Sequence, residues 1–336
     1  MLERAYDLSR SESEWLRELA EGILQNCNFV TSGALIFELP RVVPAPSEPA
    51  TVGLSEADHR KYLRAAAMLD DCLRLMPNGQ HESLFTATGC RTISALGTPE
   101  DPMERAAWEQ LLTLWSPRDV LGIVGKNPDG TGVVFAAILQ QPTVLTPWYA
   151  RHWTRMATHL AAALRLRRAL AEADSSDLGG EAVVEPSNGR LQHAIGPARS
   201  AGARAALQRA VRAIDKARGS LRRDDPISAV ELWRGLVAGR WSLVDRCDSD
   251  GRRYYVAHKN EPQALELRAL SERERQVVGY AVQGHPNKLI AYELGLDTST
   301  VSNYLRAARS KLGVRSRTEL VRVAWLLSQG SSTDGK

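Results

Sequence analysis

Apolar positions recur at helical spacing through the last seventy or so residues of the chain, and helix start and stop signals separate the repeats. Ser271 followed by Glu274 predicts a capping box, in which the hydroxyl accepts from an early backbone N–H and the carboxylate accepts from the cap residue's N–H. A second apolar stripe follows at helical spacing, formed by Leu289, Ile290 and Leu294. Gly295 then predicts the tight turn that ends this second helix.

Two further helices are predicted after that turn. Asp297, with Thr300 three residues later, is expected to cap a third helix that ends at Gly313. Its inward positions are Val301, Leu305, Ala308 and Leu312, and its outward positions are Ser299, Ser302, Asn303, Arg306 and Arg309. Ser316 and Glu319 form a second capping box. The fourth helix that follows has an apolar face made of Leu320, Val323, Ala324 and Leu327.

Two helices joined by a short turn with a glycine, the second with a polar outer face, are typical of a helix-turn-helix, whose second helix enters the DNA major groove. Along residues 270 to 320, the ordered strings SERE, NK, IA, ELGL, TV and KLGVRSRTEL resemble the LuxR-type (GerE-like) helix-turn-helix of bacterial transcription factors. The resemblance implies double-stranded DNA as the partner, a third helix that reads bases, and a fourth helix that pairs two copies into a homodimer.

The same resemblance assigns roles to individual residues. Ser302, Asn303 and Arg306 match base-facing positions, and Lys288 matches a position that contacts phosphate before the second helix. The full DNA-binding set that we expect is Lys288, Ser299, Thr300, Ser302, Asn303, Arg306, Arg309 and Lys311. The chain departs from the usual pattern at three positions: Leu289 stands where an acidic residue is common, and Ser302 and Tyr304 replace a frequent Lys and His.

Charge placement favours the same interpretation. Residues 265–336 hold 11 Lys or Arg and 7 Asp or Glu, a net charge of +4, whereas the preceding 264 residues hold 32 of each kind. Basic residues crowd around the predicted reading helix: Arg306, Arg309, Lys311, Arg315, Arg317 and Arg322. A basic surface attracts the phosphate backbone with little regard to sequence, and its affinity falls as salt rises.

Length and composition bound the remaining possibilities. A chain of 336 residues with 43% apolar and 24% charged residues is typical of a globular protein of two or three domains. No apolar run approaches the roughly 18 residues of a membrane helix, and the start MLERAYD lacks a secretory signal, so we expect a cytoplasmic protein without a membrane partner. The chain has four isolated cysteines, without Cys-x-x-Cys or His at metal spacing: Cys27, Cys72, Cys90 and Cys247. We expect them to be buried, inert thiols that bind no metal, and a redox-sensing thiol among them is the alternative.

Residues 1–172 are predicted to form one α/β domain. Its predicted elements are a helix over 11–25, a strand over 30–39, a Pro-rich loop over 40–49, a helix over 55–75, a helix over 101–115, a hairpin of strands 120–124 and 133–139, and a long helix over 146–171, while 80–98 stay undetermined. This order resembles a GAF-like sensory domain. Trp108, Trp115, Trp148 and Trp153 are either core residues, which their helical spacing favours, or the walls of a ligand pocket. His152 and His159 share a helix face, but no third metal ligand accompanies them.

A polar, Gly-rich linker over 173–180 precedes a second segment, residues 181–262. Two hairpins flank its helices: strands 182–185 with 191–194, and strands 241–246 with 252–257. One helix carries Leu207, Val211 and Ile214; another begins at Asp225-Pro226 and is expected to carry Val230, Leu232, Trp233 and Leu236. This pattern resembles a reduced PAS-like sensor or dimerisation element.

The sequence therefore predicts a multidomain protein: an α/β sensory region, GAF-like and then reduced PAS-like, followed by an all-α four-helix helix-turn-helix domain over 265–330. We interpret it as a dimeric, DNA-binding transcription regulator controlled by an unidentified signal, with RNA polymerase and a small molecule as further candidate partners. The motifs of nucleophile elbows, zinc proteases, P-loops and dinucleotide-binding folds are absent, so no catalytic residue or cofactor is expected.

Two alternatives stay open. A ligand-binding or enzyme-like domain could carry the helix-turn-helix as an accessory module. A phosphoryl-receiver domain is disfavoured because Asp70 and Asp71 lie on a predicted helix and not at a strand end.

Overall fold

The structure is a computed structural model. It describes residues 1–27, 30–39, 50–53, 55–57, 60, 88–95, 105–106, 109, 119–172, 180–247, 250–262, 267 and 269–330. The predicted loop over 40–49, most of the helices predicted over 55–75 and 101–115, and nearly all of the linker lie outside these residues, as do Asp70, Asp71, Cys72, Trp108 and Trp115. The chain divides into two compact units, Met1–Lys126 with Gly130–Leu160, and Asn127–Asp129 with Ala161–Lys336.

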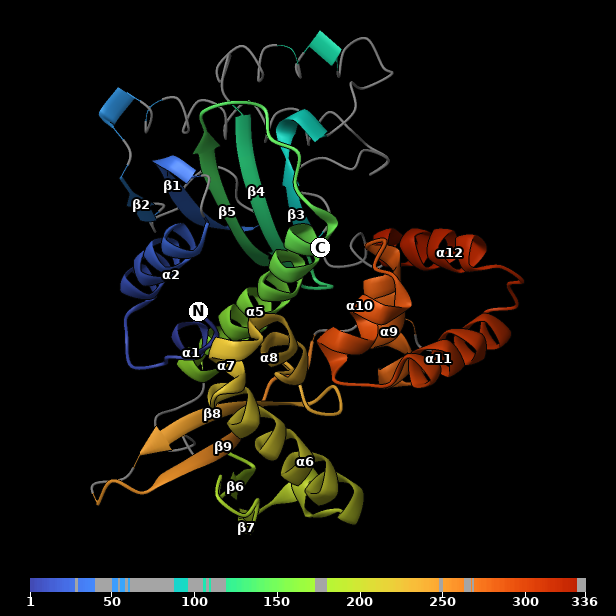
Figure 1. Ribbon diagram of the computed structural model, residues 1–336. Helices are drawn as coiled ribbons and strands as arrows, with labels where there is room; N and C mark the ends of the chain where they lie inside the picture. The colour runs from blue at the N-terminus through green and yellow to red at the C-terminus, as the bar shows by residue number, and fades with distance from the viewer. Residues whose placement is uncertain are drawn as a thin grey trace. The chain divides into compact units, whose positions relative to one another are not determined.

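Unit 1 is built on an antiparallel sheet. Its five described strands follow the order β2-β1-β5-β4-β3. They are β1 (Val30–Leu39), β2 (Ala50–Val52), β3 (Gly89–Thr92), β4 (Asp119–Lys126) and β5 (Gly132–Leu139). Two helices, α1 (Leu2–Ala5) and α2 (Glu12–Asn26), precede the sheet, and the short 3-10 helix η1 (Ile93–Ala95) follows β3 (Figure 1). Ser11 and Glu14 form a capping box at the start of α2.

The predicted hairpin and long helix are both present. β4 and β5 pair over their whole length, and Gly130 in the connecting turn has a φ of 87°, a conformation that glycine adopts without strain. Every residue of β5 is buried. The long helix α5 (Pro147–Glu172) begins in unit 1 and ends in unit 2, and Trp153, Met156 and Leu160 are buried on its inner face.

Unit 2 contains a second antiparallel sheet. The order of its four described strands is β7-β6-β9-β8, and they are β6 (Ala182–Val184), β7 (Leu191–Ala194), β8 (Trp241–Cys247) and β9 (Arg253–Lys259). Both predicted hairpins are confirmed. Between them lie η3 (Gly196–Arg199), α6 (Ala201–Arg218), α7 (Leu221–Asp224) and α8 (Pro226–Leu232). On α6, Leu207, Val211 and Ile214 are buried, as their spacing predicts.

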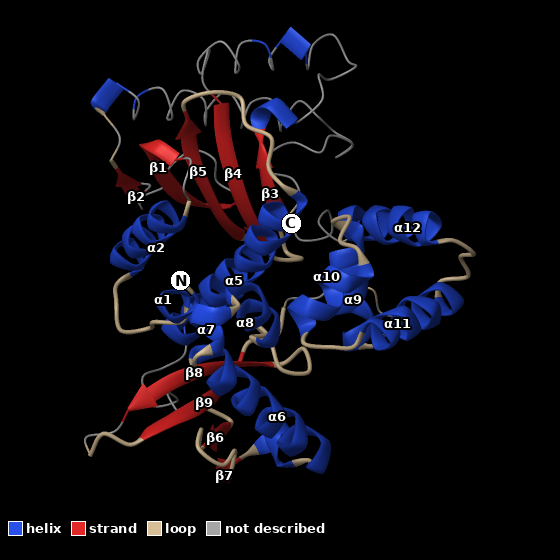
Figure 2. Cartoon of the chain, in the orientation of Figure 1, coloured by secondary structure: helices blue, strands red, loops and turns tan. Residues whose placement is uncertain are grey.

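The C-terminal region of unit 2 is helical in its described residues (Figure 2). Its helices are α9 (Glu272–Val282), α10 (Asn287–Leu294), α11 (Thr298–Lys311) and α12 (Arg317–Gly330). They correspond in order to the four helices that the apolar spacing predicts. None of the helices in the described residues is both long and apolar enough to cross a bilayer.

Two local expectations were wrong. The helix that begins at Pro226 ends at Leu232, so Trp233 and Leu236 lie beyond it. Trp233 is extended, with φ −83° and ψ 114°, which stops the helix. Asp297 occupies the cap position of α11, but its side chain makes no cap hydrogen bond.

Candidate nucleic-acid interface

The start of α9 and the turn after α10 fix the geometry of the helix-turn-helix. Ser271 and Glu274 form the predicted capping box: Glu274 N donates to Ser271 Oγ at 3.4 Å, and Ser271 N donates to Glu274 Oε2 at 2.7 Å. Gly295 ends α10 in the left-handed conformation, with a φ of 62°. A Cβ at this position would lie 1.9 Å from the carbonyl oxygen of Leu236. Glycine is therefore required both by the backbone conformation and by a neighbouring chain segment.

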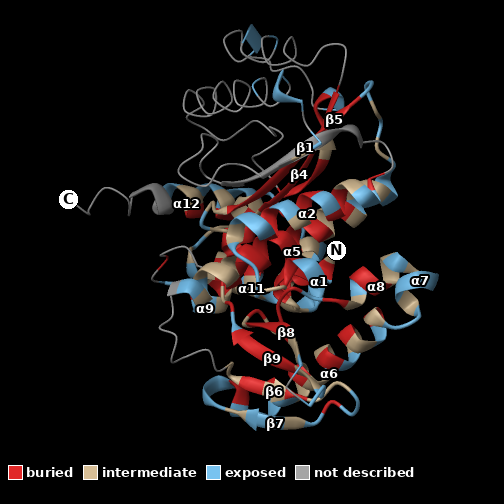
Figure 3. Cartoon of the chain, turned by 90° about the vertical axis from the view of Figure 1, so that its left-hand side faces the viewer, coloured by how far each residue is buried: buried red, intermediate tan, exposed pale blue. Residues whose placement is uncertain are grey.

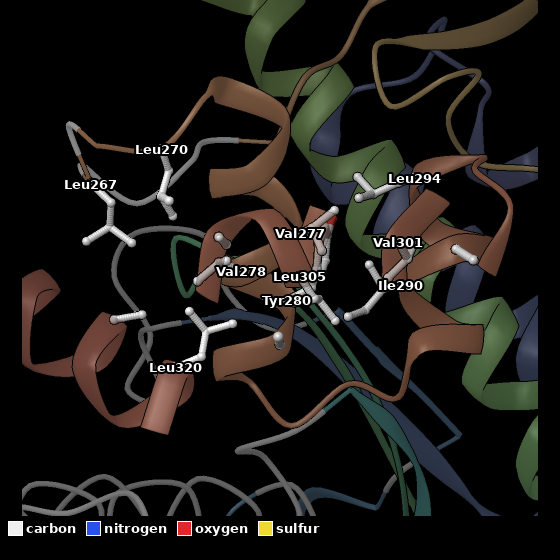
Figure 4. Close-up of a cluster of buried hydrophobic side chains, with 14 of the residues drawn as sticks. Leu267, Leu270, Val277, Val278, Tyr280, Ile290, Leu294, Val301, Leu305 and Leu320 are labelled. Atoms are coloured by element: carbon white, nitrogen blue, oxygen red, sulfur yellow. The ribbon is translucent and has the colours of Figure 1, made fainter. Parts of the chain in front are cut away.

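One face of α11 is held in a shared apolar core. Val301 and Ala308 are fully buried and Leu305 is nearly so. They pack in a cluster with side chains from the other three helices of this region, including Val277, Ile290 and Leu320 (Figure 4). Because this cluster fixes the rotation of α11, the polar face of the helix points away from the core.

The opposite face of α11 carries most of the predicted DNA-binding residues. Ser299, Asn303, Arg306 and Lys311 are exposed, whereas Thr300, Ser302 and Arg309 are half-buried. Arg306 Nη2 donates to Asn303 Oδ1 at 2.6 Å, so these two side chains hold each other on one turn of the helix. Because both side chains are exposed, their amide and guanidinium groups are accessible to the edges of DNA bases.

Three of the other predicted residues also bond within the domain. Ser302 Oγ accepts from Asn287 Nδ2 at 3.2 Å and donates to Thr298 O at 3.0 Å. Arg309 Nη1 donates to the carbonyl of Arg315 at 3.2 Å. Lys311 Nζ lies 2.8 Å from Glu274 Oε2, which ties the end of α11 to the capping box of α9 and contributes to lowering the pKa of Glu274. The sequence pattern did not reveal this pairing.

Lys288 lies on the first turn of α10 and is exposed. At the start of α12, Ser316 and Glu319 form the second predicted capping box, with Glu319 N donating to Ser316 Oγ at 3.0 Å. Leu320 and Ala324 are buried on the inner face of α12, and Val323 is half-buried. The side chain of Leu327 lies outside the described residues.

The helix-turn-helix is joined through α10 to residues 181–262, which we call the middle segment of unit 2. The Tyr292 hydroxyl lies 2.7 Å from Val230 O and 3.0 Å from Trp233 O, so its proton is shared by carbonyls at the C-terminal end of α8. Those carbonyls lack partners within α8. The Arg234 guanidinium stacks 4.7 Å from the centre of the Tyr292 ring, and Leu236 is buried in the same apolar cluster as α9, α10 and α11.

A second connection is made by polar side chains around the C-terminal part of α5, of which Asn127 and Asn260 are buried. Arg165 Nε donates to Asn260 Oδ1 at 2.9 Å, and its Nη1 donates to Asn127 Oδ1. Gln283, which follows α9, donates from Nε2 to Asn127 O at 2.6 Å. The sequence offered no signal for this network, because its members are far apart along the chain.

Glu293 of α10 lies beside this network and is buried. Burial raises its pKa to about 8, although the Arg165 charge and a hydrogen bond from Tyr280 favour the ionised form. His285 Nδ1 lies 3.4 Å from Glu293 Oε1, and both side chains are nearly inaccessible to solvent. Protonation of this carboxyl is therefore favoured at neutral pH.

The cysteine, histidine and tryptophan residues that the sequence singled out lie in different environments. Cys27 and Cys90 are buried as predicted, and burial raises the pKa of the Cys27 thiol to about 11; Cys247 is exposed, against the prediction. His159 is buried with its Nδ1 3.1 Å from the Tyr6 hydroxyl. In the described part of the chain, no group of three or more His, Cys, Asp or Glu is placed to hold a metal ion. Trp153 is a core residue, whereas Trp148 is 47% exposed.

Comparison with known proteins identifies the C-terminal region. Residues 268–324 match the sequence profile of GerE, described as bacterial regulatory proteins of the luxR family. The chain is 44% identical over 107 residues, 32% of its length, to the monoamine regulon transcriptional regulator of Klebsiella aerogenes. It is 41% identical over 68 residues to the transcriptional regulatory protein FixJ of Azorhizobium caulinodans, and 45% identical over 58 residues to the transcriptional activator protein ExaE of Pseudomonas putida.

These matches are partial on both sides. The FixJ and ExaE alignments take up 20% and 17% of this chain. The chain covers 43%, 32% and 27% of the lengths of the Klebsiella, Azorhizobium and Pseudomonas proteins. What the comparisons identify is thus a LuxR-family helix-turn-helix at the C-terminal end, in proteins named as transcriptional regulators.

Proposed function

We propose that this chain, in which residues 268–324 form a LuxR-family regulatory domain, is a DNA-binding transcription regulator and not an enzyme. The observation that carries the proposal is the orientation of α11. Its apolar face is locked into the cluster around Val301, while Asn303 and Arg306 are exposed on the opposite side. Such a helix can enter a major groove without unfolding any part of the domain.

The roles that we propose for individual residues combine this orientation with the resemblance to the LuxR-type domain. Asn303 and Arg306 read base edges, and Ser299, Thr300 and Ser302 line the same end of α11. Lys288 and Arg309 contact phosphates, and Lys311 supplies positive charge while it holds α9 and α11 together. A homodimer would place two such helices on half-sites about one helical turn apart.

The experiment that tests the proposal is selection of bound duplexes from a random library with the full chain, followed by affinity measurements on selected and scrambled sequences. Arg306→Ala is expected to reduce the preference for the selected site by roughly 1 to 3 kcal/mol per lost base contact. Lys288→Ala is expected to weaken both duplexes equally and to reduce the salt slope by about 0.9. If no duplex is enriched and none is bound at low salt, the proposal is wrong.

The front of the chain is proposed to control this activity. The domains we propose are a GAF-like domain over 1–172, a reduced PAS-like segment over 181–262 and the helix-turn-helix over 265–330. The element order of unit 1 and the two hairpins around α6 support the first two assignments. A signal there would change DNA affinity through linkage, since any ligand that prefers one arrangement of the domains shifts the population toward it.

The physical route for this control is α5. This continuous helix starts in unit 1, and its Arg165 bonds to Asn260 and Asn127, beside the carboxyl of Glu293 in α10. A shift of α5 would therefore disturb the support of the helix-turn-helix. A thermal-shift screen of the full chain against small-molecule libraries tests whether the front half binds a ligand, because a ligand selective for the folded form raises its melting temperature.

A further inference from the structure

One segment outside the helix-turn-helix carries a concentration of positive charge. Residues 196–218, which comprise η3 and α6, contain six basic residues and one acidic residue, a net charge of +5. The preceding and following regions offset this charge, because residues 1–264 hold equal numbers of acidic and basic residues. The charge of this segment exceeds the +4 of residues 265–336, although it is spread over a third as many positions.

Five of the six basic side chains are exposed, and we call them the α6 basic face: Arg199, Arg204, Arg209, Arg212 and Lys216. On α6, Arg209, Arg212 and Lys216 lie away from the buried positions around Val211, and Arg204 is exposed in the first turn. Figure 3 shows that α6 has both buried and exposed positions. The sixth, Arg218, is ion-paired with Asp245 of β8. The acidic residue, Asp215, pairs with Arg253 of β9 at 3.2 Å.

The fold uses only part of this charge: Arg212 Nη2 donates to Asn188 O at 3.0 Å, and Lys216 lies in the last turn, where the helix dipole favours a cation. Arg212 and Lys216 are four residues apart and repel each other on the helix surface. Arg204 lies in the first turn, where the positive end of the helix dipole disfavours a cation, and that turn contains no acidic residue. The helix is anchored by its buried residues and by its Ser200 cap, whose Oγ accepts from Ala203 N at 3.2 Å. An external polyanion would relieve the repulsion.

We propose that the α6 basic face is a second contact surface for duplex DNA, which binds the phosphate backbone without sequence preference. This inference rests on the proposed function. The 18 residues of α6 extend over about 27 Å, along which a duplex presents one phosphate charge per roughly 1.7 Å of axis. An acidic protein is a weaker fit, because protein interfaces centre on large apolar or aromatic anchors, and the exposed residues of α6 are Arg, Lys, Ala and Gly.

The test measures the salt dependence of binding by the full chain to a 40-base-pair duplex of random sequence, by fluorescence anisotropy. The variant is Arg204→Gln/Arg209→Gln/Lys216→Gln. Its matched control removes the same charge from exposed positions elsewhere, Arg17→Gln/Arg60→Gln/Arg252→Gln. Circular dichroism of both variants verifies that they are folded.

The triple variant is expected to lose one to three phosphate contacts, and each lost contact lowers the slope of log K against log salt by about 0.9. The control variant is expected to leave the slope unchanged. Equal slopes for the two variants would overturn the inference. Net charge alone would then account for any change in the slope, and an acidic protein would become the candidate partner of the α6 basic face. The two proposals fail separately. If Lys288→Ala alters the slope but the α6 variant does not, only this inference is wrong; if the wild-type chain binds no duplex, both are wrong.

Discussion

Replacement of Tyr292 by phenylalanine is expected to loosen the attachment of the helix-turn-helix to the middle segment. The change removes one hydroxyl and keeps the aromatic ring, so the stacking of Arg234 at 4.7 Å is preserved. What is lost is the donor for Val230 O and Trp233 O, at 2.7 and 3.0 Å. The bond is buried, and Tyr292 is 3% exposed.

The magnitude follows from the cost of leaving buried carbonyls without a donor, about 1 to 3 kcal/mol. Because about 1.4 kcal/mol corresponds to a tenfold change in an equilibrium constant, local opening should become roughly 5 to 150 times more frequent. Hydrogen exchange followed by mass spectrometry measures this directly in peptides that cover α8 and α10. Local exchange is the appropriate readout, since a chain with several domains need not unfold in one step.

The matched control is Tyr254→Phe, which removes a hydroxyl from a half-buried tyrosine on β9. It is expected to leave exchange in α8 and α10 at the wild-type rate. If Tyr292→Phe also leaves that rate unchanged, or if the two variants accelerate it equally, the hydroxyl does not hold these helices together and our description of the attachment is wrong.

Three further predictions concern the same domain. Gly295→Ala should destabilise the chain by more than the roughly 1 kcal/mol that left-handed backbone strain alone would cost, because the new Cβ would also collide with Leu236 O. A thermal unfolding midpoint equal to that of the wild type would contradict this. Ser271→Ala should cost about 1 kcal/mol by the loss of the cap, and exchange at the start of α9 measures it. Glu293→Gln should flatten the pH dependence of stability, as measured by urea unfolding between pH 5 and 8.5.

The sign of the last prediction follows from the raised pKa of Glu293. In the folded chain this carboxyl keeps its proton up to about pH 8, whereas in the unfolded chain the carboxyl loses the proton near pH 4.5. Wild-type stability should therefore fall as pH rises between these values, by at most about 1.4 kcal/mol per pH unit from this group, and no such loss should occur below them. His285, Tyr280 and Arg165 surround the carboxyl, so a slope that persists in the glutamine variant would assign the titration to a neighbour.

Features encoded over a few residues could be predicted from the sequence. The capping boxes at Ser271 and Ser316 and the left-handed glycine at 295 depend on spacing and on backbone chemistry that act within one turn. The hairpin around Gly130 has the same local origin. The helix signals among them gave the starts of α9 and α12 and the end of α10, and the apolar spacing indicated which side of α11 is buried.

Contacts between distant segments could not be predicted in this way. Leu236 was assigned to a helix, yet it enters the core of the C-terminal helices because the chain leaves α8 at Trp233. Lys311 was expected only to contact DNA, and its pairing with Glu274 spans 37 residues. Strand β3 is four residues long and has Arg91 at its centre, so it shows too little apolar alternation to be recognised.

The most direct test of the central claim is site-specific photo-crosslinking of the full chain to its selected duplex. A photoreactive residue at Asn303, on the outer face of α11, is expected to crosslink to DNA, and the same residue at Val144, which is 94% exposed in unit 1, is not. Crosslinking at both positions would indicate non-specific association. Unchanged affinity without any crosslink from position 303 would show that α11 does not enter the groove.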